Sequence, residues 1–373
     1  MLLIAMTLSR LIIQKIKQQG LISFHDFMEM ALYYPGLGFY TSDKEKIGKA
    51  GDYYTSSNLT PAFGELLGRQ IEEMWHILGE KEFTVVEMGA GMGILSGDVL
   101  SYLKRNHEFF QELNYCIVEK SPSLRKEQKK RLSNENVKWL DSINDLKGME
   151  GCIFSNELPD AFPVHVVVME NELLEVFVGY EKNFIEVLKP ASTQLKDYFK
   201  ELGITLPSGY RTEINLDMIK WIREISSALE KGFVITIDYG YPSSELYQEY
   251  RNLGNLMCYY NHSVNESPFE HIGEQDMTSH VNFSALDHWG QKSGLELSGF
   301  TDQAHFLMGL GIDEYLKDLQ EKSPMDYYKK MLPIKSLIMD MGETFKVMIQ
   351  KKGVKRAELS GLKFPSRQCQ SLK

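Results

Sequence analysis

The sequence predicts an α/β protein built on a Rossmann-like, mostly parallel β-sheet. Three observations support this fold class. Short apolar runs alternate with helical patterns between residues 83 and 155, a glycine-rich turn follows the first run, and another strong apolar run ends at Asp238. Strands that alternate with helices usually form a parallel sheet with helices on both faces. The 373 residues can form one large domain or two medium ones.

The elements follow from hydrophobic periodicity. Residues 1–34 predict two short helices that end before Pro35-Gly36-Leu37-Gly38, and a third helix follows Pro61. The core strands are predicted at Phe83–Met88, Tyr115–Val118, Val137–Leu140, Cys152–Ser155 and Phe233–Ile237, with helices at Ile94–Leu103 and Leu124–Leu132. The runs Leu295–Phe300 and Phe345–Gln350 predict two more strands, which would form a reversed pair at the sheet edge.

Three stretches depart from this alternation. Val164–Val187 contains two or three runs of Val, Phe and Ile, which predict antiparallel strands inserted after the fourth core strand. Residues 239–282 predict a long, loop-rich segment, and structureless loops of such length are usually functional. The tail from Val354 is basic and polar, so we expect it to be loosely ordered.

Composition excludes little but favours an ordinary globular enzyme. The formal net charge of −10 disfavours a nucleic-acid partner. None of the four cysteines forms a C-x-x-C pair, which favours reduced thiols. No stretch approaches the ~20 apolar residues of a membrane span, so we expect no membrane insertion. Since no signal or transit peptide is recognisable, we expect a cytoplasmic protein.

The glycine turn predicts the cofactor. Gly89, Gly91 and Gly93 lie between a strand and a helix, and glycine lets the backbone approach a ligand closely. The dinucleotide pattern G-x-G-x-x-G fails, because Ile94 or Ser96 occupies its third glycine position. Glu87 precedes the turn, and an acid there suits the cationic amino-acid end of S-adenosylmethionine better than a pyrophosphate.

Two further acids follow the next predicted strands. Glu119 lies 30 residues after Gly89 at a strand end, where Rossmann-like sheets place the acid that binds the ribose hydroxyls. Asp141 follows the third strand and is expected near the adenine. We therefore predict that Glu87, Gly89, Ala90, Gly91, Glu119 and Asp141 contact S-adenosylmethionine.

The fourth core strand leads into the candidate catalytic residues. Ligands bind beyond the carboxyl ends of the strands in such sheets, so Asn156, Glu157 and Asp160 are expected to face the methyl donor. Two carboxylates can grip the planar donors of a guanidinium, a role open to Glu157 and Asp160. The alternative is structural, with Glu157 capping a loop and Asp160 solvated.

Six segments, taken together and in order, resemble one family. They are Gly51-Asp52-Tyr53-Tyr54-Thr55-Ser56, Phe63-Gly64-Glu65, Glu87 to Gly93, Asn156-Glu157-Leu158-Pro159-Asp160-Ala161-Phe162-Pro163, Ile237-Asp238-Tyr239-Gly240, and Gly273 to Phe283. This set is similar to the MidA-like methyltransferases, the family of a mitochondrial complex I assembly factor that methylates a protein arginine. The resemblance covers roughly residues 5–350.

The resemblance implies a class I methyltransferase core, mostly a parallel seven-stranded sheet with a reversed edge strand. It also implies a protein substrate methylated symmetrically on arginine, with a respiratory-complex subunit as one candidate. Asp52, Tyr54, Thr55 and Asn156 would then join the cofactor site, the first three as a lid. The expected organisation is a helical region with the lid at 1–80, the core at 81–162 and 211–353, a β-rich insertion at 163–210, a substrate-side segment at 239–282, and a tail at 354–373. One departure is visible, because Ser57-Asn58 replace the Pro-Glu frequent in the family.

Other functions remain open. The aromatic segment Tyr239–Tyr260 could line a closed pocket, which would indicate a small-molecule methyltransferase. An assembly or scaffold protein could bind the cofactor without catalysis. His262, His271, Asp276 and His280 have no compact metal-ligand spacing, so they are expected to be structural and no metal is predicted. The acceptor protein and the oligomeric state are not predicted.

Overall fold

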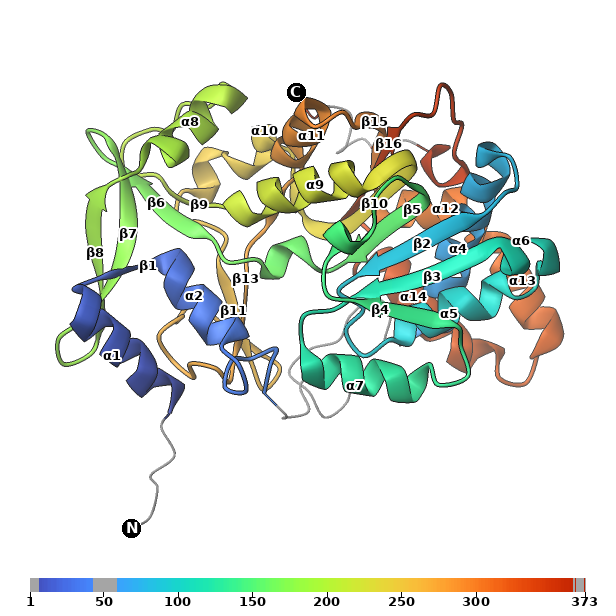
Figure 1. The fold of residues 1–373 in the computed structure, drawn as a ribbon, viewed down its shortest axis with the longest axis horizontal. Helices are drawn as coiled ribbons and strands as arrows, with labels where there is room; N and C mark the ends of the chain where they lie inside the picture. Colours follow the sequence, from blue (N-terminus) through green and yellow to red (C-terminus); the bar gives the residue numbers. More distant parts are fainter. Residues whose placement is uncertain (1–6, 43–58, 365, 367–371, 373) are drawn as a thin grey trace, which may run out of the picture. The chain divides into compact units, whose positions relative to one another are not determined.

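A computed structural model describes residues 7–42, 59–364, 366 and 372, and the chain divides into two compact units (Figure 1). The first unit comprises Met1–Tyr53, Pro159–Lys220 and Ser243–Val281. The second comprises Tyr54–Leu158, Trp221–Pro242 and Asn282–Lys373. The helix α9 (Leu216–Ala228) and the short strand β14 (Val281–Asn282) each include residues of both units. The predicted lid residues Asp52, Tyr54 and Thr55 lie outside the described residues.

The second unit is built on one large sheet. Its strands run in the order β15–β16–β10–β5–β2–β3–β4, with bounds β15 Glu296–Asp302, β16 Phe345–Lys352, β10 Leu229–Tyr241, β5 Met149–Asn156, β2 Phe83–Met88, β3 Leu113–Val118 and β4 Val137–Leu140. Neighbouring strands from β10 to β4 are parallel. Figure 1 shows helices on both faces of this sheet. The predicted fold class is therefore confirmed.

The position of the reversed strand differs in detail from the prediction. The reversed strand is β16, which lies between β15 and β10 and is therefore second from the edge of the sheet. It runs antiparallel to both neighbours, so the edge strand β15 has the same direction as the parallel strands. Three helices, α12 (Gln303–Gly309), α13 (Ile312–Lys322) and α14 (Tyr327–Met339), connect β15 to β16. Periodicity locates each strand but not its neighbour, because pairing is decided by contacts between distant segments.

Local sequence explains the helices of this unit. The helix α4 (Pro61–Leu78) begins where the Thr60 hydroxyl accepts a hydrogen bond from the Ala62 N–H and ends at left-handed Gly79. Further helices described in this unit are α5 (Ile94–Leu103), α6 (His107–Glu112), α7 (Pro122–Arg131) and α11 (Phe283–Lys292). The apolar face of α4 and one face of the central strands form a core, which includes Phe63, Ile71, Val85 and Ile235. Burying each such side chain contributes about 1.5–3 kcal/mol.

The described part of the tail is more ordered than predicted. Leu359 and Gly361 are buried, and the Ser360 N–H donates to the Glu73 carboxylate of α4. The Gly361 N–H donates to Gln70 Oε1 at 3.0 Å. The tail residues up to 364 thus pack on the second unit, because long-range partners compensate for their polar composition.

Among its described residues, the first unit contains two smaller sheets. In one, β7 (Leu173–Tyr180) pairs with β6 (His165–Met169), β8 (Phe184–Pro190) and β1 (Ile22–Ser23), and β6 pairs with β9 (Arg211–Ile214). All of these pairings are antiparallel, which confirms the predicted antiparallel strands. The helices α1 (Leu8–Gln19), α2 (Phe24–Tyr33), α8 (Thr193–Leu202) and α10 (Ser243–Leu246) also belong to the described part of this unit.

The segment 239–282 holds more regular structure than predicted. It contains a three-stranded antiparallel sheet of β11 (Met257–Tyr260), β12 (Ser263–Asn265) and β13 (Asp276–Thr278). These strands have three or four residues each, too few to show an alternating pattern. Asn261 and His262 have positive φ and form the turn between β11 and β12.

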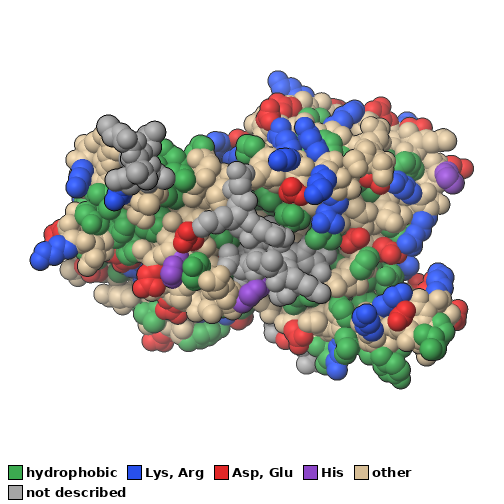
Figure 2. Space-filling view, turned by 90° about the horizontal axis from the view of Figure 1, so that it is seen from below, with side chains coloured by type: hydrophobic (Ala, Val, Ile, Leu, Met, Phe, Trp, Pro, Cys, Tyr) green, Lys and Arg blue, Asp and Glu red, His purple; other side chains and the backbone are tan. Residues whose placement is uncertain are grey.

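Charges are mixed on the surface. Figure 2 shows Lys and Arg side chains interspersed with Asp and Glu side chains over the described part of one face. None of the helices that the structure describes has the length and apolarity to cross a membrane.

Candidate functional site

The strand register brings the predicted cofactor residues of the second unit to one edge of its sheet. Met88 at the end of β2 is paired with Ser155 of β5 and with Val118 of β3. Val118 is paired in turn with Leu140 at the end of β4. The carboxyl ends of these four strands are therefore adjacent, and this edge is where open α/β sheets bind ligands.

The glycine turn after β2 has the backbone that its sequence predicts. Gly89, Gly91 and Gly93 have φ values of 71°, 51° and 72°, in the left-handed region that favours glycine. The Gly89 N–H donates to the Val118 carbonyl at 2.9 Å. A Cβ atom added at Gly89 would lie 2.7 Å from Leu158 Cδ1, so Leu158 packs directly on the turn.

Glu87 is held by protein groups beneath this turn. Its carboxylate is buried and accepts hydrogen bonds from the Tyr115 hydroxyl at 2.8 Å and from the Ser96 hydroxyl. Burial raises the pKa of Glu87 to about 7, although both hydroxyl donors oppose that shift. The contact of Glu87 with the amino-acid end of the cofactor stays a prediction, since the observed partners give it a role in fixing β2, β3 and α5.

Glu119 directly follows the last residue of β3 and is only 7% exposed. Its Oε1 accepts from the Ser121 N–H at 2.8 Å, and its Oε2 accepts from Gln128 Nε2 at 3.0 Å. Burial raises the pKa of Glu119, while these donors and the Arg125 charge oppose the shift. A carboxylate fixed by donors at a strand end is suited to accept the ribose hydroxyls, and that role stays a prediction.

Sequence reasoning missed two residues of α7 that organise this edge. Arg125 Nη2 donates to the carbonyls of Glu119 at 2.6 Å and Leu140 at 2.8 Å. Gln128 Nε2 also donates to the Gly91 carbonyl at 2.8 Å. Arg125 and Gln128 are three residues apart and so share a helix face, which is the one signal that could have singled them out.

Asp141, another predicted cofactor residue, is strongly exposed. Its side chain is 89% exposed, and its Oδ1 pairs with Arg125 Nη1 at 2.8 Å. The ion pair attaches the end of β4 to α7. Its proximity to the adenine is not tested by these contacts and stays a prediction.

Asn156 and Glu157 follow the end of β5. Glu157 has φ of 53°, which is uncommon for a residue with a side chain and occurs often at functional sites. Its N–H donates to the Ile237 carbonyl at 2.9 Å, and its Oε1 accepts from Asn156 Nδ2 at 3.0 Å. Asn156 Oδ1 is buried and has no hydrogen-bond partner among the described residues. It is thus an acceptor available to a bound cofactor or substrate.

Asp160 belongs to the first unit. It lies in the short 3-10 helix Pro159–Ala161, is 5% exposed, and its carbonyl accepts from the Ser279 N–H at 2.9 Å. Its burial argues against the solvated alternative. The pairing of Glu157 with Asp160 in a guanidinium clamp stays a prediction, because the two residues lie in different units.

The histidine-rich loops have structural partners. His280 Nδ1 lies 3.2 Å from Asn255 Oδ1, and burial lowers the pKa of His280 to about 4. The rings of His271 and Tyr260 stack with centroids 3.8 Å apart. These contacts support the structural interpretation of both histidines.

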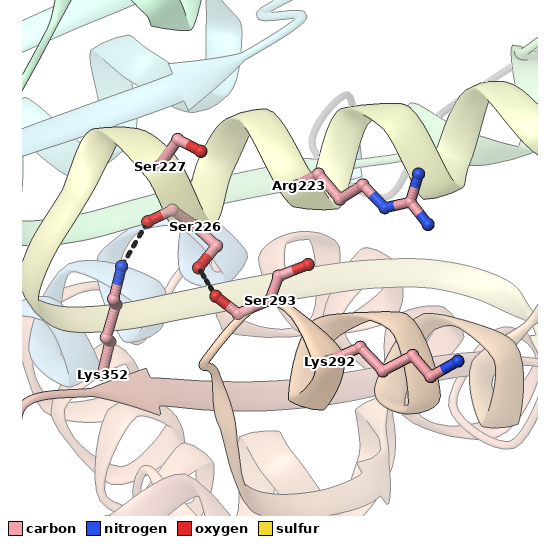
Figure 3. A pocket seen from close by; sticks show the side chains of 6 residues that line it. All are labelled: Arg223, Ser226, Ser227, Lys292, Ser293 and Lys352. Carbon is pink, nitrogen blue, oxygen red and sulfur yellow. Dashed lines mark hydrogen bonds between the residues drawn. The ribbon is translucent and has the colours of Figure 1, made fainter.

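A basic pocket of about 370 Å³ lies at the opposite end of the large sheet (Figure 3). Its lining residues are Arg223, Ser226, Ser227, Lys292, Ser293 and Lys352. Lys352 pairs with Gly232 near the start of β10, whereas the cofactor edge is formed by strand carboxyl ends. Lys352 Nζ donates to the Ser226 carbonyl at 2.6 Å, and the Ser226 hydroxyl donates to the Ser293 carbonyl at 2.6 Å. Lys352 therefore caps the C-terminal end of α9, and Ser226 bonds the residue that follows α11. The pocket is separate from the cofactor edge.

The fold and the turn define a class I methyltransferase, with a parallel sheet, one reversed strand and a glycine turn that excludes the dinucleotide pattern. The family model described as "Putative S-adenosyl-L-methionine-dependent methyltransferase" matches residues 66–301. The chain belongs to this family.

Individual relatives agree with this membership. A solved protein of Burkholderia thailandensis bound to S-adenosyl-homocysteine is 31% identical, covers 96% of this chain and 95% of its own, and superposes with a TM-score of 0.87. A Caenorhabditis elegans relative named protein arginine methyltransferase NDUFAF7 homolog, mitochondrial, is 26% identical over 91% of this chain and 85% of its own length. The human protein arginine methyltransferase NDUFAF7, mitochondrial, is 27% identical over 84% and 75%.

The protein is thus an S-adenosylmethionine-dependent methyltransferase, and its residues fit that cofactor. The left-handed glycines remove the side chain at alternate positions of the turn, which lets a nucleoside approach the backbone closely. Buried Glu119 offers a carboxylate to ribose hydroxyls. The unpaired acceptor Asn156 Oδ1 suits a ligand that carries a cationic amino group.

The prediction of a cytoplasmic location was wrong. It rested on the lack of a recognisable targeting segment, whereas the curated relatives that match this chain are named as mitochondrial proteins. Burial and packing patterns reflect the fold and carry no information on the compartment.

Proposed function

We propose that this methyltransferase acts on arginine side chains of a protein substrate. The observation that carries the proposal is the left-handed backbone of Glu157. Its neighbours in the chain are Asn156, whose Oδ1 is available as an acceptor, and Leu158, whose side chain packs on Gly89. The Asn156 amide donates to the Glu157 carboxylate at 3.0 Å, one residue before the leucine that packs on the cofactor turn. The names of the relatives, protein arginine methyltransferases, support the same acceptor.

The chemistry follows from these groups. The cofactor supplies a methyl group bound to a positively charged sulfur. The Glu157 carboxylate would accept two N–H donors of the substrate guanidinium, which fixes the plane of the group and concentrates electron density on the remaining nitrogen. Alignment within about 3–3.5 Å of the methyl carbon supplies most of the rate. When the N–C bond forms and the S–C bond breaks, the nitrogen releases one proton, which a neighbouring carboxylate can accept.

Labelled S-adenosylmethionine tests this proposal. The protein is incubated with the cofactor and cell lysate, and the labelled proteins are hydrolysed for analysis of methylated amino acids. Methylarginine is the expected product, and mass spectrometry of the intact peptide identifies the acceptor protein. Label that appears in another amino acid, or in a small molecule with no protein label, would overturn the arginine assignment.

Two variants sharpen the test. Glu157→Gln should bind S-adenosyl-homocysteine normally and lose at least about 100-fold in transfer. A hydrogen bond to a charged group contributes about 1.5–3 kcal/mol, and glutamine removes the charge from both bonds and turns one of the two acceptors into a donor. Glu80→Gln is the matched control, because Glu80 also has a positive φ, 59°, but is paired with His76 on the surface at the end of α4. Normal transfer by Glu157→Gln would exclude the carboxylate from the reaction.

A further inference from the structure

The helix α7 carries one polar side chain that is completely buried, Gln128, in a sequence that otherwise consists mostly of exposed basic and polar residues. Burying an amide is costly unless all of its hydrogen-bonding atoms find partners. Gln128 also packs against the glycine turn, because a Cβ atom added at Gly93 would lie 3.4 Å from Gln128 Cγ. The buried Gln128 amide therefore needs hydrogen-bond partners for its oxygen and for its two N–H groups.

The amide oxygen and both N–H groups of Gln128 have partners, and these partners fix the amide in one orientation. The indole N–H of Trp139, which can only donate, donates to Gln128 Oε1 at 3.1 Å. Oε1 must therefore point to β4, and Nε2 points to the turn. The two protons on Nε2 go to the Gly91 carbonyl at 2.8 Å and to Glu119 Oε2 at 3.0 Å. One side chain thus connects the ends of β2, β3 and β4.

We propose that Gln128 is a positioning residue for the adenosine part of the cofactor, because its amide holds the Glu119 carboxylate at a fixed place relative to the Gly89–Gly93 turn. This inference rests on Glu119 as the acid that binds the ribose. It does not depend on the methyl acceptor, since it concerns binding of the cofactor alone.

The charges around Glu119 give Gln128 a second effect. Burial raises the pKa of Glu119, and the Gln128 N–H is among the groups that lower it, together with the Ser121 N–H and the Arg125 charge. The Glu119 charge in turn raises the pKa of Glu87 on β2, and Asp141 is paired with Arg125. An ionised carboxylate accepts ribose hydroxyls more strongly than a protonated one, which loses an acceptor and the charge. Affinity for the cofactor is therefore lost as pH falls through the pKa of Glu119, and removing the Gln128 donor moves that loss to a higher pH.

Calorimetric titration of the full chain with S-adenosyl-homocysteine, repeated across a pH series, tests the proposal. Gln128→Met keeps the approximate volume and removes the amide. We expect affinity at neutral pH to fall about 10- to 100-fold, the loss of one hydrogen bond to a charged group, and the pH midpoint of binding to rise. Gln70→Met is the matched control, because Gln70 is a fully buried helical glutamine of the same unit with two hydrogen bonds of its own. This control should leave both quantities unchanged.

A purely structural role for Gln128 predicts lower thermal stability with wild-type affinity and an unchanged pH midpoint, and that result would overturn the proposal. If Gln128→Met does not fold, Gln128→Glu decides, because it has the same size and replaces the donor by an acceptor facing Glu119. Weaker binding at neutral pH is expected, and wild-type affinity in that variant would refute the positioning role. The two tests are independent. The lysate experiment can show that arginine is not the acceptor, and the binding measurements on the Gln128 variants would still support or refute the role of Gln128.

Discussion

Replacing Glu87 by Gln should stabilise the second unit at alkaline pH. Glu87 is buried, and its pKa is raised to about 7 from an ordinary value of 4.5. The folded chain therefore binds this proton more tightly than the unfolded chain does. The contribution to stability is fully present below pH 4.5 and is lost as pH rises toward 7. A difference of about 2.5 pKa units corresponds to about 3 kcal/mol.

Glutamine retains an oxygen that accepts from Tyr115 or Ser96 and carries no charge. Glu87→Gln should therefore match the wild type near pH 4.5 and exceed its stability by up to about 3 kcal/mol at pH 8. Hydrogen exchange of peptides from β2 and β3, followed by mass spectrometry across this pH range, measures the local stability. Glu80→Gln, on the surface, should show no such trend. A stability difference between Glu87→Gln and wild type that does not grow between pH 4.5 and pH 8 would refute the reasoning.

Two further variants separate cofactor binding from transfer. Gly91→Val should abolish binding of S-adenosyl-homocysteine in a calorimetric titration, because φ of 51° disfavours a branched side chain and the side chain would enter the space of the ligand; unchanged affinity would show that the turn does not contact the cofactor. Asp160→Asn should bind the cofactor normally and lose at least about tenfold in arginine transfer, the loss of one charged hydrogen bond; full transfer in the labelled assay would remove Asp160 from the proposed clamp.

The difference between Glu87 and Gln128 shows the limit of sequence reasoning at this site. Glu87 was recognised because it precedes the glycine turn, but its hydroxyl partners come from β3 and α5, which no local pattern connects to it. Gln128 lies in a polar helix and gave no apolar periodicity, so its burial became evident only in the fold. Hydrogen-bond partners depend on tertiary contacts, whereas a turn backbone depends on residues next to each other.

The sequence by itself determined the local elements. The predicted strands Phe83–Met88 and Val137–Leu140 and the helix Ile94–Leu103 match the structure residue for residue, because their periodicity and flanking turns are local properties. The same holds for the left-handed turn at Gly89–Gly93, since φ values of this kind favour glycine.

Only the tertiary structure decided how these elements combine. It placed reversed β16 inside the sheet, folded part of 239–282 into a three-stranded sheet, and assigned Glu157 and Asp160 to different units. It also joined Glu119 to the glycine turn through Gln128. Each of these results depends on contacts between segments far apart in the chain, where packing and hydrogen-bond satisfaction choose among pairings that the sequence pattern leaves equivalent.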